Sequence, residues 1–195
     1  MKKLPCVVTV ALLSAHAIMA ADLVLHSFKK QQLTDEFWCE GAYIGDFNHD
    51  GKMDVEAGPF WYAGPAFTSR SEIYAATATY DRDGGGGKKE KTPGFAGAKS
   101  GINAYSDNFL SYVHDFNADG WDDVLVYGFP GKEAFWYENP KGAAGPWPRH
   151  VTLASVDNES PAWGDLTGDG KPEIVCMSGG FVGYVEELPG ANTQG

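Results

Sequence analysis

The sequence has few cysteines, few basic residues and no hydrophobic run long enough to cross a membrane. It contains three Cys in 195 residues, and 15 Lys and Arg against 26 Asp and Glu give a formal net charge of −11. Because a nucleic-acid binder needs a basic surface to neutralise phosphates, this charge argues against nucleic acid as a partner. No Cys-x-x-Cys spacing occurs, so a zinc or thiol redox site has no support. The length predicts one compact domain or a piece of a larger one.

A secretory signal peptide is predicted for residues 1–20. Lys2 and Lys3 precede an apolar run over 4–13, and small residues follow this run. The run is shorter than the roughly 20 apolar residues that a membrane-spanning helix needs. We therefore expect cleavage after Ala17 or Ala20, a mature domain over 21–195, secretion or export to the periplasm, and no membrane span.

Two cysteines, Cys39 and Cys176, remain after the signal peptide. In an oxidising compartment they could form a disulfide, which would stabilise the fold by closing a long loop. They could also be two separate buried thiols, each packing as a small apolar residue. The sequence gives no distance between them, so both interpretations stay open.

Three blocks of the chain are similar to one another and align without a gap. Residues 42–57 read AYIGDFNHDGKMDVEA, residues 111–126 read SYVHDFNADGWDDVLV, and residues 161–176 read PAWGDLTGDGKPEIVC. Apolar residues precede and follow a polar nine-residue loop in each block, which predicts strand, loop, strand. No helical periodicity appears between the loops. The fold class predicted is therefore all-β, with one four-stranded antiparallel unit per repeat.

The repeat units are predicted to span about 23–80, 104–149 and 150–190. A strand near His26 and one near His150 are expected to hold equivalent places in successive units. Between the first two units, four consecutive glycines and four charged residues follow Asp83. Such a segment buries little surface, so residues 81–103 are predicted to be a mobile insertion.

The three loops repeat oxygen-bearing side chains at positions one, three, five and nine, with glycine at position six. Calcium binds six to eight oxygens from carboxylates, amides, carbonyls and water, and the glycine allows the sharp bend that such a loop needs. The sequence therefore predicts three calcium sites. The predicted metal ligands are Asp46, Asn48, Asp50 and Asp54; Asp115, Asn117, Asp119 and Asp123; and Asp165, Thr167, Asp169 and Glu173.

Two other interpretations of these loops were weighed against calcium. An EF-hand loop needs a ligand at position twelve and a following helix, but position twelve is Ala57, Val126 or Cys176 and strands follow. Asp and Asn could also only cap their own backbone in Asx turns. Three acidic loops in register favour a cation, because the carboxylates would otherwise repel one another. Magnesium suits the loops less, since it requires rigid octahedral geometry. The third loop departs from the pattern through neutral Thr167 and the longer Glu173.

The loop motifs GDFNHDGKMD, HDFNADGWDD and GDLTGDGKPE resemble the FG-GAP/VCBS repeat family of secreted β-propellers. The resemblance implies four-stranded blades around an axis, with calcium held by the aligned loop residues between two strands of each blade. Closed propellers have about four to eight blades, whereas this chain has three loops. We expect an incomplete propeller that is part of a longer one; closure by oligomerisation and an open set of sheets are the alternatives. An open blade edge would favour self-association.

The function that these features predict is a secreted calcium-binding repeat module that binds carbohydrate or another extracellular protein. Trp61, Tyr62, Trp136 and Tyr137 are candidates for stacking on sugar rings, although aromatics in a strand repeat usually pack between blades. The alternative, implied by the resemblance, is part of a propeller-type carbohydrate lyase or dehydratase. Its candidate bases are His26, His49, His114 and His150. No nucleophile elbow, HExxH, P-loop or dinucleotide motif is present, so no catalytic residue is assigned.

Overall fold

The computed structural model describes residues 27–76, 79–93 and 108–187. The chain divides into two units, residues 1–31 and 32–195, and every strand described belongs to the second. The predicted signal peptide and His26 lie outside the described residues. Within the described part all regular structure is β-strand, as predicted, and no helix is present that could span a membrane.

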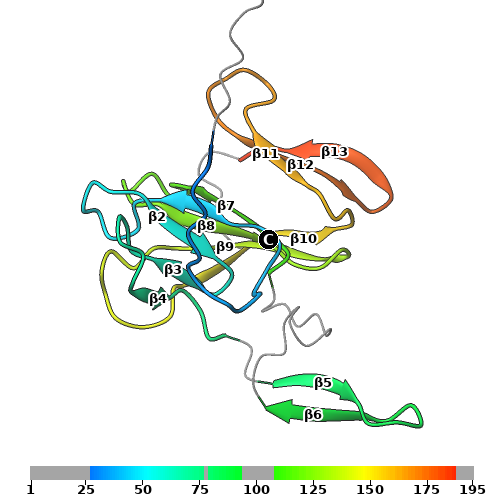
Figure 1. The fold of residues 1–195 in the computed structure, drawn as a ribbon. Coiled ribbons are helices and arrows are strands. Elements are labelled where there is room, and N and C mark those ends of the chain that lie inside the picture. The colour runs from blue at the N-terminus through cyan, green and yellow to red at the C-terminus, as the bar shows by residue number, and fades with distance from the viewer. Residues whose placement is uncertain (1–26, 77–78, 94–107, 188–195) are drawn as a thin grey trace, which may run out of the picture. The chain divides into compact units, whose positions relative to one another are not determined.

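The first sheet contains four antiparallel strands in the order β1-β2-β3-β4 (Figure 1). The turn between β2 and β3 needs glycine at position 58, where φ is +65° and an added Cβ would lie 2.5 Å from the Cβ of Trp38. A side chain is therefore excluded both by the backbone conformation and by the space. The strands are β1 (Tyr43–Gly45), β2 (Asp54–Ala57), β3 (Phe60–Tyr62) and β4 (Arg70–Glu72).

The second sheet also has four antiparallel strands, and the third has three. The second sheet has the order β10-β9-β8-β7 and consists of β7 (Leu110–His114), β8 (Asp123–Tyr127), β9 (Lys132–Tyr137) and β10 (Arg149–Val156). The third has the order β11-β12-β13 and consists of β11 (Ala162–Gly164), β12 (Glu173–Ser178) and β13 (Phe181–Val185). None of these sheets closes on itself.

The second sheet corrects one predicted unit boundary. The sequence analysis began the third unit at residue 150, but β10 pairs with β9 through contacts such as His150 opposite Trp136. The strand that carries His150 is therefore the fourth strand of the second sheet. Its counterpart in the first sheet is β4, at the end of the unit, rather than a strand near His26 at its start.

The segment predicted to be a mobile insertion contains a hairpin that the sequence analysis missed. Strands β5 (Thr79–Asp83) and β6 (Lys89–Pro93) pair in an antiparallel manner. The amide of Gly84 donates a hydrogen bond of 2.8 Å to the carbonyl of Lys88, which closes the turn. The turn residues are exposed, in keeping with the expectation that this segment buries little surface. Residues 94–103 of the predicted insertion lie outside the described residues.

The second sheet packs on both of its faces, which explains why β8 is buried along its whole length. Successive side chains of a strand point to opposite faces. On one face, Val124 and Val126 pack in a cluster with Phe47 and Ile73 from the first repeat. On the other face, Leu125 and Tyr127 pack in a cluster with two residues of β12, Ile174 and Cys176. Full burial of one such aliphatic side chain contributes about 1.5–3 kcal/mol to folding.

The four aromatic residues proposed to stack on sugars lie in or against hydrophobic clusters, Tyr62 in a separate one that it forms with Trp38 and Phe60. Tyr62 and Tyr137 are buried, and Trp61 and Trp136 are half-buried and pack against hydrophobic clusters. Their burial favours a role in core packing over that of an exposed sugar platform.

The two cysteines of the predicted mature chain are separate, buried thiols rather than a disulfide. Cys39 donates a hydrogen bond to the carbonyl of Gly41 at 2.8 Å. Burial raises the pKa of the Cys39 thiol to about 12, so the reactive thiolate is disfavoured. Cys176 belongs to the core between the second and third sheets. The sequence left a disulfide and two separate thiols open. In the structure, Cys39 and Cys176 are two separate thiols that pack as small apolar residues.

Candidate metal-binding loops

Each predicted metal loop connects two antiparallel strands of one sheet. The first joins β1 to β2, the second β7 to β8, and the third β11 to β12. The residue before each loop lies opposite its ninth residue in the strand pairing: Gly45 opposite Asp54, His114 opposite Asp123, and Gly164 opposite Glu173. The strand pairing thus fixes both ends of every loop, and the strand–loop–strand prediction is confirmed at all three places.

All three loops use the left-handed backbone conformation at positions four and six. Position six is glycine in each loop. Position four is occupied by different residues, two of which carry a side chain. The φ values at position four are +60° for His49, +55° for Ala118 and +80° for Gly168, and those at position six are +80° for Gly51, +88° for Gly120 and +88° for Gly170. The common backbone indicates that the three loops are one structural motif.

This backbone predicts opposite stability effects for two substitutions in the second loop. Ala118→Gly relieves a left-handed alanine and is expected to stabilise the fold by about 0.5 kcal/mol, whereas Gly120→Ala is expected to destabilise it by about 1–2 kcal/mol. Nothing lies within 4 Å of a Cβ added at Gly120, so the cost comes from the backbone alone. Urea unfolding with a chelator present measures both changes. Two changes of the same sign would contradict the left-handed conformation.

The first acid of each loop accepts hydrogen bonds from amides within its own loop. In the first loop, the Asp46 carboxylate accepts from the amides of Asp50 at 3.0 Å and Gly51 at 2.9 Å. In the second, Asp115 accepts from Asp119 at 3.0 Å and Gly120 at 2.8 Å. These are the Asx-type bonds of the alternative interpretation. Backbone amides therefore already offset part of the carboxylate charge in these loops.

A lysine also offsets charge in the second loop. The Nζ of Lys141 lies 2.9 Å from Oδ2 of Asp119, and the amide of Trp121 donates to the other oxygen of the same carboxylate at 3.0 Å. Lys141 follows β9 and reaches the loop from a neighbouring turn. Carboxylate repulsion alone therefore does not require a metal ion in this loop.

The ninth residue of each loop is buried and accepts hydrogen bonds from backbone amides. In the third loop Glu173 accepts from Leu166 at 2.7 Å and Thr167 at 3.2 Å, both within the loop. Asp54 accepts from Phe47 at 3.0 Å and Gly64 at 2.8 Å. Asp123 accepts from Phe116 at 3.0 Å and Asn139 at 2.7 Å. Burial raises the pKa of Asp54, and it raises that of Asp123 to about 7, although the amide hydrogen bonds oppose the shift. In these two loops the ninth carboxylate thus ties the loop to the following turn.

The third loop brings its acids closest together. One carboxylate oxygen from each of Asp165, Asp169 and Glu173 lies within 4.8 Å of the others. Thr167 also points toward this group, because its hydroxyl donates to Glu173 Oε1 at 3.3 Å. Among the described residues, no other set of three His, Cys, Asp or Glu side chains converges in this way. The loop with the weakest sequence match therefore has the geometry closest to a cation site.

Two residues that the sequence analysis did not single out join the first loop to the second. Asp122 accepts a hydrogen bond from the amide of Asp46 at 2.7 Å. The side-chain amide of Asn139 donates to the carbonyls of Phe47 at 3.0 Å and Asp122 at 3.1 Å. Asp122 is at position eight of its loop, where the first loop has Met53 and the third has Pro172. Because an acid does not recur at this position, the repeat alignment did not indicate a role for Asp122.

A family comparison supports the interpretation of these loops as repeats. Residues 115–176 match the model of the FG-GAP-like repeat. The chain carries an FG-GAP-like repeat. The match begins at the first acid of the second loop and ends in β12, so it includes the third loop. It confirms the predicted family over this segment. No curated protein and no solved structure matches the chain.

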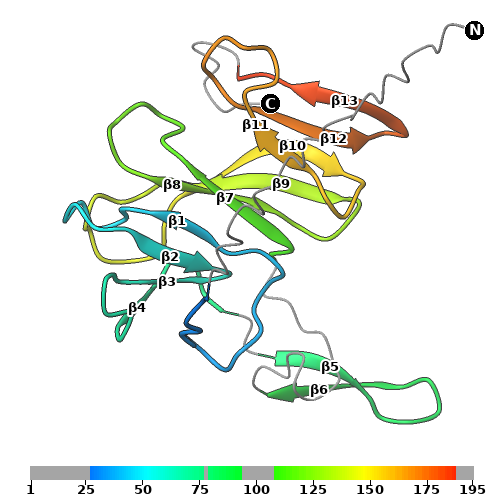
Figure 2. The same ribbon diagram turned by 45° about the horizontal axis from the view of Figure 1, so that its top comes forward.

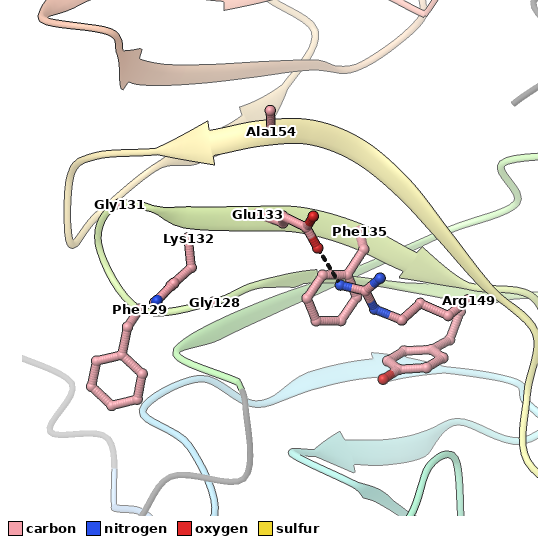
Figure 3. Close-up of a pocket in the computed structure, with 9 residues that line it drawn as sticks. Gly128, Phe129, Gly131, Lys132, Glu133, Phe135, Arg149 and Ala154 are labelled. Carbon is pink, nitrogen blue, oxygen red and sulfur yellow. Dashed lines mark hydrogen bonds and ion pairs between the residues drawn. The ribbon is translucent and has the colours of Figure 1, made fainter. Parts of the chain in front are cut away.

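A pocket of about 660 Å³ lies within the FG-GAP-like repeat, beside β9 and β10 (Figure 3). The Arg149 guanidinium lies 3.9 Å from the centre of the Phe135 ring and is held by Glu133 at 2.7 Å. The pocket therefore combines a cation, a carboxylate and aromatic rings. Its lining consists of Gly128, Phe129, Gly131, Lys132, Glu133, Phe135, Tyr137, Arg149 and Ala154.

The three described histidines each contact aromatic rings. His49 lies 4.4 Å from the ring of Trp121, which is in the second loop, and His114 contacts Phe116 and Trp163 edge-on. His150 stacks on Trp136 with ring centres 4.3 Å apart, and its Nε2 lies 2.9 Å from Glu138 Oε2. Of the three candidate bases that the structure describes, His150 is thus the one with a carboxylate that can orient it.

Proposed function

We propose that this chain is a secreted, calcium-stabilised module of β-propeller-type repeats that binds a carbohydrate or another protein. The proposal of calcium binding rests on the convergence of the Asp165, Asp169 and Glu173 carboxylates in the third loop. Carboxylate oxygens are the ligands that calcium prefers. The loop lies within the segment that matches the FG-GAP-like repeat. There a bound ion would hold the loop between β11 and β12 in one conformation.

The third loop offers calcium the best fit. Asp165, Asp169 and Glu173 would supply carboxylates, Thr167 a hydroxyl, and Lys171 its backbone carbonyl. The first two loops present corresponding oxygens that do not converge in this way, and in all three loops several of the oxygens also accept amide hydrogen bonds. A bound calcium ion would supply positive charge that draws the acidic side chains of one loop together. The ion would thereby couple folding to the calcium concentration.

Replacing Asp169 with alanine is expected to abolish calcium binding at the third loop. The change removes one of three converging carboxylates, whereas Lys171→Ala in the same loop removes a side chain that is not a predicted ligand. Isothermal titration calorimetry should show that Asp169→Ala loses one bound ion per chain and that Lys171→Ala loses none. Absence of calcium binding to the unaltered protein would contradict the proposal, and equal losses in both variants would contradict the ligand assignment.

The binding role rests on the FG-GAP-like repeats and on the pocket beside Arg149. A repeat fold alone does not specify a ligand, because function depends on the site. Lys132, Glu133 and Arg149 offer hydrogen-bond donors and acceptors, and Phe129 offers a partly exposed ring. These groups suit a sugar that bears a carboxylate. Binding to an array of charged and neutral glycans separates this ligand from a protein partner.

A carbohydrate lyase or dehydratase is the second candidate, and the His150–Glu138 pair is the observation that favours it. A general base needs a partner that holds its ring in one orientation, and Glu138 at 2.9 Å could do so. An assay of double-bond formation in uronic-acid oligosaccharides tests this candidate. Activity that is retained in His150→Ala would exclude His150 as the base.

A further inference from the structure

We propose that Lys141 takes the place of a metal ion in the second loop, so that this loop keeps its shape without calcium. The cation that offsets the acids of this loop is then a side chain of the protein itself. The sequence predicted calcium at all three loops, and the surroundings of the second loop do not fit that prediction. The proposal concerns a different loop from the proposed calcium site and does not depend on whether the third loop binds calcium.

Strand pairing brings Lys141 to the second loop. The end of β9 lies beside the start of β8, because Tyr137 pairs with Val124. The turn after β9 and the loop between β7 and β8 therefore lie at the same end of the second sheet (Figure 2). The backbone at Lys141 has a φ of +56°, and its amide donates to Oδ1 of Asn139 at 2.9 Å. Asn139 is itself buried and donates to one carbonyl of the first loop and one of the second. A buried side chain thus fixes the Lys141 backbone next to the loop.

The Lys141 side chain reaches the acid at position five of the loop. Its Nζ lies 2.9 Å from Oδ2 of Asp119, whose side chain is 15% exposed. The Oδ2 atom is buried, and no hydrogen-bond donor of the described residues serves it apart from this ion pair. A carboxylate oxygen that is withdrawn from water needs a positive partner to remain charged. Lys141 supplies that partner.

Backbone amides occupy the remaining side-chain oxygens at the four predicted ligand positions of this loop. They donate to both oxygens of Asp115 and Asp123, to Oδ1 of Asn117 and to Oδ1 of Asp119. The one oxygen left over is Oδ2 of Asp119, which pairs with Lys141. Every predicted ligand oxygen of the second loop therefore already has a partner from the chain.

The first loop shows that the amides alone do not distinguish the second. Amides donate to both oxygens of Asp46 and of Asp54 in the same way. The difference lies at position five, where Oδ2 of Asp50 lies 3.4 Å from the neutral side-chain amide of Asn48. Among the described residues, no basic side chain forms an ion pair with an acid of the first or third loop. The ammonium is thus the feature that sets the second loop apart.

The lysine belongs to the second repeat alone. Tyr62 and Tyr137 hold equivalent places, because each pairs with the residue that follows position nine of its loop. Four residues beyond them, the first repeat has Ala66 where the second has Lys141. Aligned in the same way through β12 and β13, the third repeat has Pro189 at this position of the sequence. The repeat therefore does not require a lysine here, and its presence distinguishes one loop from the other two.

A calcium ion that entered the second loop would have to displace the ammonium from Asp119. If both stayed, two positive charges would lie close together and repel each other. Lys141 is therefore expected to weaken calcium binding at the second loop while it offsets the loop's charge in the absence of metal. Removal of the lysine charge should turn the second loop into one that binds calcium.

Nuclear magnetic resonance of the full protein during titration with calcium chloride tests the proposal loop by loop. The amides of Gly51, Gly120 and Gly170 each donate to the first acid of one loop, so their resonances report on the three loops separately. We expect Lys141→Gln to lower the calcium concentration that half-saturates the Gly120 shift by about tenfold or more, because the competing charge is gone. Glutamine keeps most of the length of the side chain.

The matched control is Lys52→Gln, which removes the same charge from position seven of the first loop. Among the described residues Lys52 forms no ion pair, so this variant should leave the Gly120 response unchanged. Melting curves in the presence of a chelator establish that both variants are folded. Half-saturation of Gly120 at the same calcium concentration in the unaltered protein and in Lys141→Gln would overturn the proposal, and so would a second loop that takes up no calcium in either protein. A Gly170 resonance that does not respond would contradict calcium at the third loop and would leave the role of Lys141 standing.

Discussion

Replacing Asp123 with alanine is expected to lower the free energy of unfolding by about 3 kcal/mol. Its carboxylate is fully buried at the start of β8 and accepts the amides of Phe116 and Asn139 at 3.0 and 2.7 Å. The substitution leaves one buried and one partly buried N–H group without an acceptor, and a buried group left in this way costs about 1–3 kcal/mol. Urea denaturation in the presence of a chelator measures this structural role without any contribution from bound metal.

The matched control is Asp119→Ala in the same loop. Asp119 also accepts a backbone amide, that of Trp121, but its second oxygen pairs with Lys141, whose side chain is 48% exposed. Water can hydrate the groups left behind, so we expect a loss of about 1 kcal/mol or less. Asp123→Asn should fall between the two, because the amide keeps one acceptor oxygen. Similar losses for Asp119→Ala and Asp123→Ala would show that the buried amide bonds do not stabilise the loop.

The local structure of the loops could be predicted from the sequence because it depends on residues within nine positions of one another. The glycine at position six and the acids around it recur three times, and apolar strands flank each copy. Pairing such as Gly45 opposite Asp54 then follows from the antiparallel hairpin itself. The contacts that join one loop to the next were not predictable in this way. Asp122 and Asn139 act across 76 and 92 residues, at positions that the other repeats do not share.

The assignment of strands to sheets could not be derived from local pattern either. Strand β10 alternates exposed and partly buried residues, which is compatible with a place at either edge of a unit. The strand with which β10 pairs determines the sheet to which it belongs, and that strand is β9. The hairpin of β5 and β6 was missed because its glycines and charges resemble a linker. Both cases depend on pairing between segments, which composition does not report.

The charge argument for calcium was also incomplete at the level of sequence. Counting acids predicted strong repulsion in each loop, but the count omits the backbone amides and Lys141 that approach the carboxylates. What distinguishes the third loop is the convergence of three carboxylate oxygens, one of which belongs to Glu173. The departure that seemed to weaken this site in the sequence therefore contributes to its geometry.

Replacing Glu56 with glutamine is expected to raise stability above pH 8 and to remove part of the pH dependence of unfolding. Glu56 is fully buried on β2, and the hydroxyl of Ser111 donates to its Oε2. Burial raises the pKa of Glu56 from 4.5 to about 8, because the charged form loses its hydration. The native state therefore holds this carboxyl protonated near neutral pH, whereas the unfolded chain ionises it.

The sign of the effect follows from the raised pKa. Below pH 4.5 the carboxyl is neutral in both states and its contribution to stability is fully present. As the pH rises toward 8 this contribution is lost, by up to about 5 kcal/mol. Glutamine stays neutral in both states, so Glu56→Gln should show a flatter stability curve between pH 4.5 and 8. The two proteins should be most similar below pH 4.5.

Glu133→Gln supplies the matched control for the buried carboxyl. Glu133 is a half-exposed partner of Arg149, and exposed pairs contribute about 0–1 kcal/mol. Its pH curve should therefore follow that of the unaltered protein. Urea unfolding at intervals between pH 4 and 9, with a chelator present, gives all three curves. If Glu56→Gln ran parallel to the unaltered protein over this range, the carboxyl would have to ionise equally in both states, and burial between the first and second sheets would be wrong.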